Sequence, residues 1–338
     1  MIIKLYEKIK KYLKQNIKLI ILMIVLYFIF TIPLSCYIYL PGGIKDISQK
    51  VNINDEYKSN GSFNFAYVTE IRGTIPTLLI SYLMPNWERV QEEDIKYDNE
   101  SYEEVSYRNK MFLDEANQNA AYVVYNKLGK KFIINKYHNY VVYIYDKART
   151  DLKIGDEIIE IEGEKLTTQE QYSSLIEKYN IGDTINLKVI EEGKEKDKYI
   201  KVINYNDSKI TGIYLVTKYD YECNPKINFN FEEDESGPSG GFMLALAIYN
   251  KLTPTDITKG YRIVGTGTID RNGNVGEVGG IEYKLKSAIN SKADIFLVAN
   301  GSNYEEAIKI KEDKNYKIKI IGVSTFDDAL RYLENLAT

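Results

Sequence analysis

The sequence predicts a multidomain chain of mixed α/β (α+β) class. We expect an N-terminal transmembrane helix, a β-rich domain with one helix, and a C-terminal domain of alternating strands and helices. Three observations predict this organisation. Residues 19–40 contain no charged residue. Short strand patterns separated by Gly-containing turns fill residues 137–205. Strand and helix patterns then alternate through residues 206–338.

Composition excludes several functional classes. The 338 residues suffice for two modest domains and further segments, and the net charge of −4 does not favour a nucleic-acid partner. Two cysteines, Cys36 and Cys223, and one histidine, His138, are too few for a disulfide framework or a zinc site. No glycine-rich loop of the ATP-binding type is present. We therefore expect no metal and no cofactor.

The first 40 residues predict a single-pass membrane anchor. Residues 1–18 contain six lysines and one glutamate. The charge-free residues 19–40 then supply the roughly 20 apolar residues that a bilayer-spanning helix needs. This run is too long for the hydrophobic region of an ordinary cleaved signal peptide. Because the basic residues come first, we expect residues 1–18 in the cytoplasm and the chain after Pro41 outside the cell membrane.

Cys36 leaves two interpretations open. Residues 33–36, PLSC, resemble a lipoprotein processing site, although Pro33 stands where such sites normally have leucine. Cys36 is therefore either a lipid attachment site or a buried cysteine in an apolar helix.

Residues 41–136 are predicted to form a membrane-proximal region with strands and a helix. The polar stretch up to about residue 60 is expected to be a linker. From Ser62, SFNFAYVTEI alternates like a strand. Residues 102–131 carry apolar side chains at helical spacing, and Gly129 is a stop signal.

Residues 137–205 combine a β-rich stretch, the turn and strand LKIGDEIIEIEG, a helix and a hairpin. Thr168 and Gln171 are spaced as in a capping box at the start of the helix. The hairpin has two alternating strands around Glu192-Gly193. This order of elements resembles a bacterial PDZ domain, and the LKIGDE turn followed by a short strand is the most specific part of the match.

The resemblance to PDZ domains implies peptide binding, in which an extended peptide is added as a strand to an exposed sheet edge. The edge that matches in this sequence comprises Tyr140, Val141, Val142, Tyr143 and Ile144. The alternative is that this domain only packs against the rest of the chain.

Ser239 lies in GPSGG, residues 237–241, between the strand-like INFNF and the helical FMLALAIYNKL. It is either a turn residue or a nucleophile held at a strand-to-helix corner. A serine nucleophile needs a base. His138 opens the PDZ-like region and would reach Ser239 only if the two domains were locked together, so a lysine base is favoured.

Lys284 has the features required of such a base. It lies on a predicted helix after Gly279 and Gly280, and it shares one face with Ile281, Leu285 and Ala288. Lys286 points elsewhere. Burial among apolar groups disfavours the ammonium form and lowers the pKa of a lysine.

GPSGG, followed by GTGTI and VGGIEYK, resembles the proteolytic domain of the Lon family over about Gly212 to Leu333. The resemblance implies that Ser239 is the nucleophile and Lys284 the general base. It also implies that Thr266, in GTGTI, helps to hold the lysine. Ser236 departs from the pattern, because ATP-dependent Lon enzymes often have an acid at that position. Asp234 and Glu235 lie just upstream, so the contribution of an acid stays open.

Three glycines in the motif are expected to support catalysis. The backbone N–H groups of Ser239 and Gly240, at a helix N-terminus, could stabilise an oxyanion. Gly237, Gly240 and Gly241 leave room for a substrate backbone. Pro238 has no N–H and stiffens the turn.

The whole arrangement of anchor, PDZ domain and Lon-type proteolytic domain resembles the membrane-bound PDZ–Lon proteases of Gram-positive bacteria. It implies an ATP-independent serine endopeptidase that cleaves peptides or exposed protein segments at the outer membrane face. The PDZ domain would recognise or present substrate, the lipid bilayer would hold residues 19–40, and a homo-oligomer is conceivable. Two alternatives stay open: a catalytically silent PDZ/Lon-like peptide-binding scaffold, and a lipid-anchored receptor.

Overall fold

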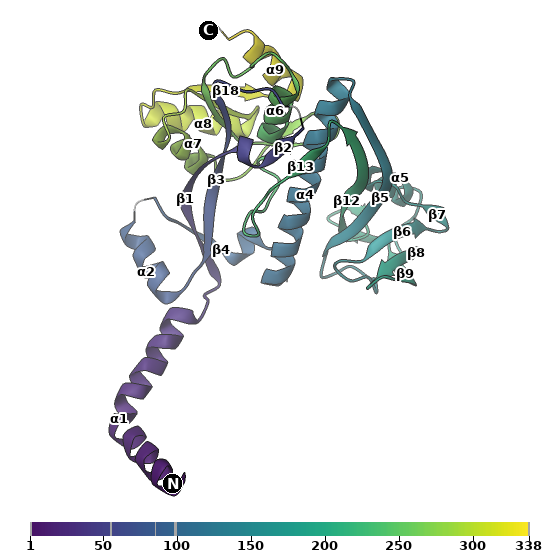
Figure 1. Ribbon diagram of the computed structural model, residues 1–338. Coiled ribbons are helices and arrows are strands. Elements are labelled where there is room, and N and C mark those ends of the chain that lie inside the picture. Colours follow the sequence, from purple (N-terminus) through teal and green to yellow (C-terminus); the bar gives the residue numbers. More distant parts are fainter. Residues whose placement is uncertain (1, 55, 85, 98–99, 337–338) are drawn as a thin grey trace. The chain divides into compact units, whose positions relative to one another are not determined.

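The computed structural model describes residues 2–54, 56–84, 86–97 and 100–336 (Figure 1). The chain divides into two compact units. The first unit comprises Met1–Pro41 and Val68–Ile95, and the second comprises Gly42–Tyr67 and Lys96–Thr338.

The first unit begins with the long helix α1 (Ile2–Thr31), of which Leu5–Thr31 is long and apolar enough to cross a membrane. The predicted span 19–40 is wrong at its end, because strand β1 (Cys36–Asp46) already begins at Cys36. Pro33 explains the difference: it lacks an N–H and disfavours helix in the residue before it. The alternating CYIYL suits a strand instead, and Cys36 is buried in that strand as a free thiol.

Short elements complete the first unit. The start of β1 pairs antiparallel with β4 (Glu88–Gln91), and α3 (Glu92–Ile95) follows. Helix α2 (Ile75–Leu83) begins after Thr74, whose side chain forms a capping box with Thr77.

In the second unit, the central sheet has the order β18–β17–β14–β3–β1, and β4 continues it from β1 in the first unit. The bounds of the four strands not yet given are β3 Ser62–Arg72, β14 Arg262–Gly265, β17 Ile295–Ala299 and β18 Lys319–Val323. The pairs β3–β14, β14–β17 and β17–β18 are parallel. The domain boundary predicted at residue 206 is therefore too late, because β3 from the predicted membrane-proximal region lies inside this sheet.

Helices cover both faces of the sheet, and the alternation of side chains along the strands explains the two layers. Ile263 and Leu297 belong to a buried cluster with α4 (Tyr102–Lys127), α6 (Gly241–Leu252) and α9 (Phe326–Glu334). Val264 and Phe296, their neighbours in sequence, belong to a cluster with α7 (Ile281–Asn290) and α8 (Ser302–Asp313). The result is an α/β/α arrangement.

Several short elements line the edge of this domain. Strand β13 pairs antiparallel with β2, and β15 with β16. Their bounds, with the single turn of 3₁₀-helix η1, are η1 Ile47–Gln49, β2 Val51–Ile53, β13 Ile227–Phe229, β15 Thr268–Ile269 and β16 Val275–Gly276.

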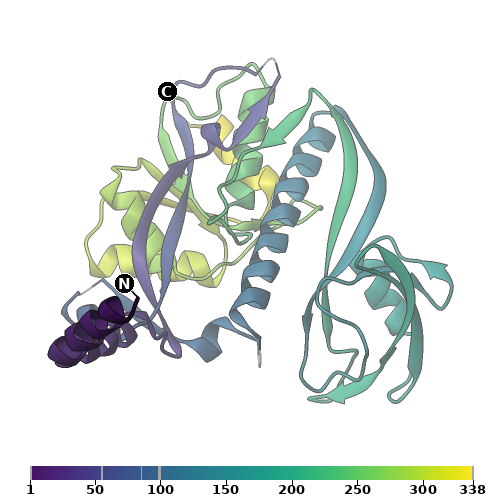
Figure 2. The ribbon, with the colours of Figure 1, turned by 60° about the horizontal axis from the view of Figure 1, so that its bottom comes forward.

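The predicted PDZ region forms a second sheet, in the order β12–β5–β6–β8–β9, around its own core. Its elements are β5 Lys131–Ile144, β6 Glu157–Ile161, β7 Glu164–Lys165, α5 Gln169–Ile176, β8 Thr184–Glu191, β9 Lys194–Lys201, β10 Ile203–Tyr205, β11 Ser208–Ile210 and β12 Ile213–Asn224. Figures 1 and 2 both show α4 between α6 and the long strands β5 and β12, in agreement with the contacts that α4 makes to each.

Candidate active site

Ser239 lies in the turn that joins β13 to α6, where the backbone on both sides is held by hydrogen bonds. The Ser239 carbonyl accepts from Gly267 N at 2.8 Å and from Thr266 Oγ1 at 3.0 Å. The N–H of Gly237 donates to the carbonyl of Asn109 on α4 at 2.9 Å. Gly237 has φ +87°, a left-handed conformation that favours glycine. The serine is therefore fixed between α4 and the segment that follows β14.

Two backbone donors beside the serine are left without a protein acceptor. In the described part of the chain, the N–H groups of Ser239 and Gly240 donate to no protein group, whereas Gly241 N donates to Pro238 O at 3.1 Å. Gly240 is the N-cap of α6, where unsatisfied amides and the helix dipole favour negative charge. This geometry suits a developing oxyanion.

Gly241 has a packing role in addition. A Cβ at this position would lie 3.1 Å from the Ala116 side chain and 3.2 Å from Ile269, so a larger residue would push α6 away from α4. Gly237 and Gly240 are different, because a Cβ there would meet nothing closer than 3.6 Å. The side of the turn that carries Gly237 and Gly240 is therefore open.

Lys284 lies on the buried face of α7 with Ile281, Leu285 and Ala288, as the sequence predicts. Its side chain is 5% exposed, and burial lowers the pKa of Lys284 to about 8. The N-cap of α7, Gly280, has φ +71°, and the left-handed conformation explains the second glycine of the Gly-Gly pair.

Among the described residues, Lys284 differs from the other buried lysines. Lys50 pairs with Glu235 at 2.9 Å, Lys198 with Asp156 at 2.7 Å and Lys251 with Glu56 at 2.8 Å. Lys284 has no carboxylate partner in the same part of the chain. A buried, unpaired ammonium is costly, so the lysine gives up its proton more readily than an exposed lysine does.

Strand β14 lies next to both elements that carry the predicted catalytic residues, the turn with Ser239 and helix α7 with Lys284. Helix α7 packs against β14, and Thr266, immediately after β14, holds the carbonyl of Ser239. No hydrogen bond joins Ser239 Oγ to Lys284 Nζ in the ranges that the structure describes. The dyad stays a prediction. Thr266, which is fully buried, donates to the Ser239 carbonyl, and the role that the resemblance assigned to it beside the lysine stays a prediction.

Glu235, an acid just upstream of Ser236, is a functional candidate to which the sequence analysis assigned no definite role. Its carboxylate pairs with Lys45 and with Lys50, and it accepts from Glu232 N at 2.8 Å. Burial raises the pKa of Glu235, but the two lysines and the Glu232 amide together leave it lowered. The acid therefore anchors the loop that leads to Ser239. Lys45 and Glu235 are 190 positions apart, so no local pattern could reveal the pair.

The predicted peptide-binding edge of the PDZ region is occupied, so that prediction is wrong in this structure. Strand β12 pairs antiparallel with the whole of β5, with Ile213 opposite Ile144 and Val216 opposite Tyr140. Leu215 of β12 is buried in the PDZ core, and Thr217 Oγ1 accepts from Gln169 N of α5 at 3.1 Å. The chain itself supplies the strand that a peptide ligand was expected to supply.

His138 is fully engaged away from the serine. Its Nδ1 lies 2.8 Å from Glu157 Oε1, and its Nε2 lies 3.2 Å from Asp220 Oδ2. Both ring nitrogens contact carboxylates between β5, β6 and β12.

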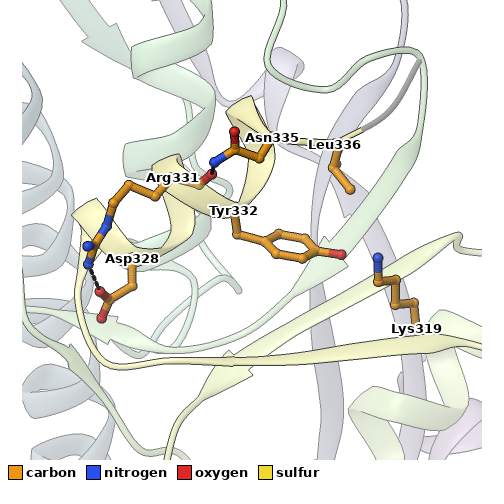
Figure 3. A pocket seen from close by; sticks show the side chains of 6 residues that line it. All are labelled: Lys319, Asp328, Arg331, Tyr332, Asn335 and Leu336. Carbon is orange, nitrogen blue, oxygen red and sulfur yellow. Dashed lines mark hydrogen bonds and ion pairs between the residues drawn. The ribbon is translucent and has the colours of Figure 1, made fainter.

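A separate depression of about 670 Å³ lies on α9 and β18 (Figure 3). Its lining residues are Lys319, Asp328, Arg331, Tyr332, Asn335 and Leu336. Arg331 pairs with Asp328, and Asn335 Nδ2 donates to the Arg331 carbonyl, so these side chains mainly contact one another. None of the predicted catalytic residues lines it.

Comparison with known proteins agrees with both resemblances. Residues 233–335 match the Lon protease (S16) C-terminal proteolytic domain, and residues 127–202 match a PDZ domain. The chain carries a PDZ domain and a Lon-type proteolytic domain. With the apolar helix α1, this combination fits a membrane-anchored PDZ–Lon protease.

Curated relatives match the proteolytic part of the chain. The Lon protease of Campylobacter concisus (strain 13826) is 32% identical over 97 residues, and that of Neorickettsia sennetsu (strain ATCC VR-367 / Miyayama) is 29% identical over 98 residues. Each match covers 29% of this chain and only 12% of the relative. Among solved structures, the PDZ domain of an SdrC-like protein from Listeria monocytogenes is 25% identical. The match covers 23% of this chain and 86% of that one, with a TM-score of 0.21.

Proposed function

We propose that the chain is a serine endopeptidase in which Ser239 is the nucleophile and Lys284 the general base. The observation that carries the proposal is the state of Lys284, which is buried and without a carboxylate partner in the described ranges, with its pKa lowered to about 8. The anchored carbonyl of Ser239 and the free N–H groups of Ser239 and Gly240 support it. The Lon-type domain match supports a peptidase independently.

The reaction follows from these groups. Neutral Lys284 accepts the proton of Ser239 Oγ as this oxygen attacks the carbonyl carbon of the scissile peptide bond. The resulting oxyanion accepts hydrogen bonds from the N–H groups of Ser239 and Gly240. The C–N bond then breaks as the Lys284 ammonium returns its proton to the leaving amine. Water, deprotonated by Lys284, hydrolyses the acyl-enzyme and regenerates the serine hydroxyl.

The cellular setting is part of the same proposal. We take α1 as a membrane anchor with its N-terminus in the cytoplasm, because the lysines cluster before the apolar run. The catalytic domain then acts outside the membrane on peptides or exposed protein segments. We include independence from ATP, since the sequence shows no phosphate-binding loop.

The test is a comparison of new protein N-termini at the surface and in the medium of cells that carry the wild-type chain, Ser239→Ala or Lys284→Ala. We expect one set of termini to disappear in both variants. Ser236→Ala, three residues before the nucleophile and exposed, is the matched control and should keep the set. Identical profiles for wild type and Ser239→Ala, in cells where deletion of the protein has an effect, would contradict the proposal.

A further inference from the structure

Helix α2, in the first unit, presents an apolar surface to the outside. None of its nine residues is charged. Large side chains on it and directly after it are exposed, with Leu79 63% and Leu83 79% exposed. We define the α2 apolar surface by its exposed members, which are Ile75, Leu79, Ile80, Tyr82, Leu83 and Met84. Soluble surfaces rarely concentrate apolar side chains in this way.

The polar residues of α2 are turned the other way. Ser81 is only 1% exposed and donates to the carbonyl of Leu78 at 2.6 Å. Thr77 is engaged with Thr74 in the N-terminal capping box. A helix on the surface of a soluble domain buries its apolar stripe and exposes its polar one. In α2 this pattern is inverted, which indicates that its outer surroundings are apolar.

The position of α2 shows what those surroundings are. The N–H of Leu34, three residues after α1, donates to the carbonyl of Gly73 at 2.8 Å, and Gly73 N donates to Cys36 O at 2.8 Å. These bonds tie the residue before the N-cap of α2 to the end of α1. Helices α1 and α2 are also in contact, and Figure 1 shows α2 beside the end of α1 that leads into β1.

The side chains around the α2 apolar surface are those found at a bilayer interface. The Arg89 guanidinium lies 4.2 Å from the centre of the Tyr82 ring and donates to the Ser81 carbonyl at 3.3 Å. Trp87 follows the helix within four residues. Tyrosine and tryptophan are enriched where acyl chains meet headgroups, and arginine can extend from there into water.

We propose that α2 lies in the outer interfacial layer of the same bilayer that α1 spans, with its apolar surface against phospholipid acyl chains. The inference rests on the proposed role of α1 as the membrane anchor. It gives the first unit two points of membrane attachment, one that spans the bilayer and one that lies along its surface. This limits the orientations available to the chain that leaves the membrane.

The experiment uses tryptophan fluorescence, because Trp87 is the single tryptophan of the chain and Trp87→Phe leaves a blank background. Three probes are added to that background in the full chain. Leu83→Trp tests the α2 apolar surface, Phe28→Trp tests α1, and Tyr199→Trp on the PDZ surface is the water-exposed control. Each protein is reconstituted in vesicles of phosphatidylcholine and phosphatidylglycerol, with plain or brominated acyl chains.

We expect brominated lipid to remove most of the emission of Leu83→Trp and Phe28→Trp, and iodide in the buffer to quench neither strongly. Tyr199→Trp should show the opposite pattern. If Phe28→Trp is quenched by brominated lipid but Leu83→Trp is quenched by iodide, α1 remains an anchor and the inference for α2 is overturned. Protection of Leu83→Trp from both quenchers also overturns it, because protein, such as a second copy of the chain, then covers the surface. Loss of lipid quenching at Phe28→Trp would refute the anchor itself.

Discussion

Two buried lysines in different domains show how surroundings decide what a lysine does. Lys198, on β9 of the PDZ domain, lies 2.7 Å from Asp156 Oδ2 and 2.8 Å from Glu191 Oε2. Burial lowers the pKa of Lys198, but the two carboxylates outweigh it and leave that pKa raised. Lys284, on α7 of the proteolytic domain, lies deeper among protein atoms, although both residues are nearly inaccessible to solvent, and burial alone lowers its pKa to about 8.

The comparison separates a structural lysine from one that can accept a proton. Asp156 also accepts from the backbone N–H of Lys153 at 2.7 Å, so Lys198 belongs to a network that fixes the turn at Gly155. Its charge is part of that network. The surroundings of Lys284 instead favour loss of the proton, which is the property that a general base needs near neutral pH. The presence or absence of a carboxylate partner, together with the depth of burial, sets the role.

The largest difference is expected when each lysine is replaced by arginine. Arginine keeps its charge at any physiological pH and cannot act as a base. Lys284→Arg should therefore lower kcat/KM by about 10²- to 10⁴-fold, the usual contribution of a general base. Lys198→Arg keeps a cation beside Asp156 and Glu191 and should stay within about threefold of wild type, since a surviving structural ion pair leaves the distant chemistry unchanged.

The measurement is steady-state hydrolysis of a fluorogenic peptide that spans a cleavage site found by the N-terminus comparison. An equal loss of kcat/KM in the two variants would show that both lysines affect activity only by stabilising the structure. The proposed difference between a catalytic and a structural lysine would then be wrong.

The same pair should respond with opposite signs in stability. Lys198→Met leaves Asp156 and Glu191 without their shared partner, and loss of one member of a buried ion pair typically costs about 3–5 kcal/mol. Lys284→Met removes a buried ammonium that has no partner in the described ranges. It should raise the free energy of unfolding at pH 7 by about 1–3 kcal/mol.

Denaturant unfolding of the detergent-solubilised chain measures both effects. The stability advantage of Lys284→Met over wild type should shrink as pH rises from about 8 to about 10.4. Over that range the native wild-type chain has lost the Lys284 proton while the unfolded chain still holds it, so wild type becomes more stable. A destabilised Lys284→Met would mean that the ammonium is well accommodated in the native protein.

Local sequence patterns predicted the parts of the site that depend on neighbouring residues. The turn at Ser239, the helix after it and the buried face of α7 all follow from spacing and glycine positions within short segments. Gly280 was placed correctly at the start of α7, and its left-handed conformation accounts for a glycine there.

Features that depend on distant strand partners were missed. Nothing within residues 62–72 shows that β3 pairs with β14, about 200 positions away, so the proteolytic domain was predicted to begin too late. The pairing of β12 with β5 was not expected either. The sequence of a sheet edge does not show whether a peptide ligand or another strand of the same chain pairs with it. The ion pair of Lys45 and Glu235 was missed for the same reason, because its two residues lie far apart in the sequence. Long-range pairing is set by tertiary packing, which local periodicity does not record.

The pH dependence of catalysis is expected to be a smaller effect than the arginine substitutions and the stability changes. It tests the difference between Lys284 and Lys198 most directly. If only neutral Lys284 is active, kcat/KM should rise about tenfold per pH unit at low pH and level off above a pKa of about 8. Between pH 6 and pH 8 the rise is then roughly 50-fold.

Lys198→Arg should follow the same curve, because the ion pairs of the PDZ domain take no part in the proton transfer. Circular dichroism at each pH excludes unfolding as the cause of any change. A curve that is flat, or that bends near the usual pKa of histidine, would remove Lys284 as the base. If the apparent pKa of the profile shifts in Lys198→Arg, the two lysines influence each other electrostatically. That result would contradict the view that Lys198 has only a structural role.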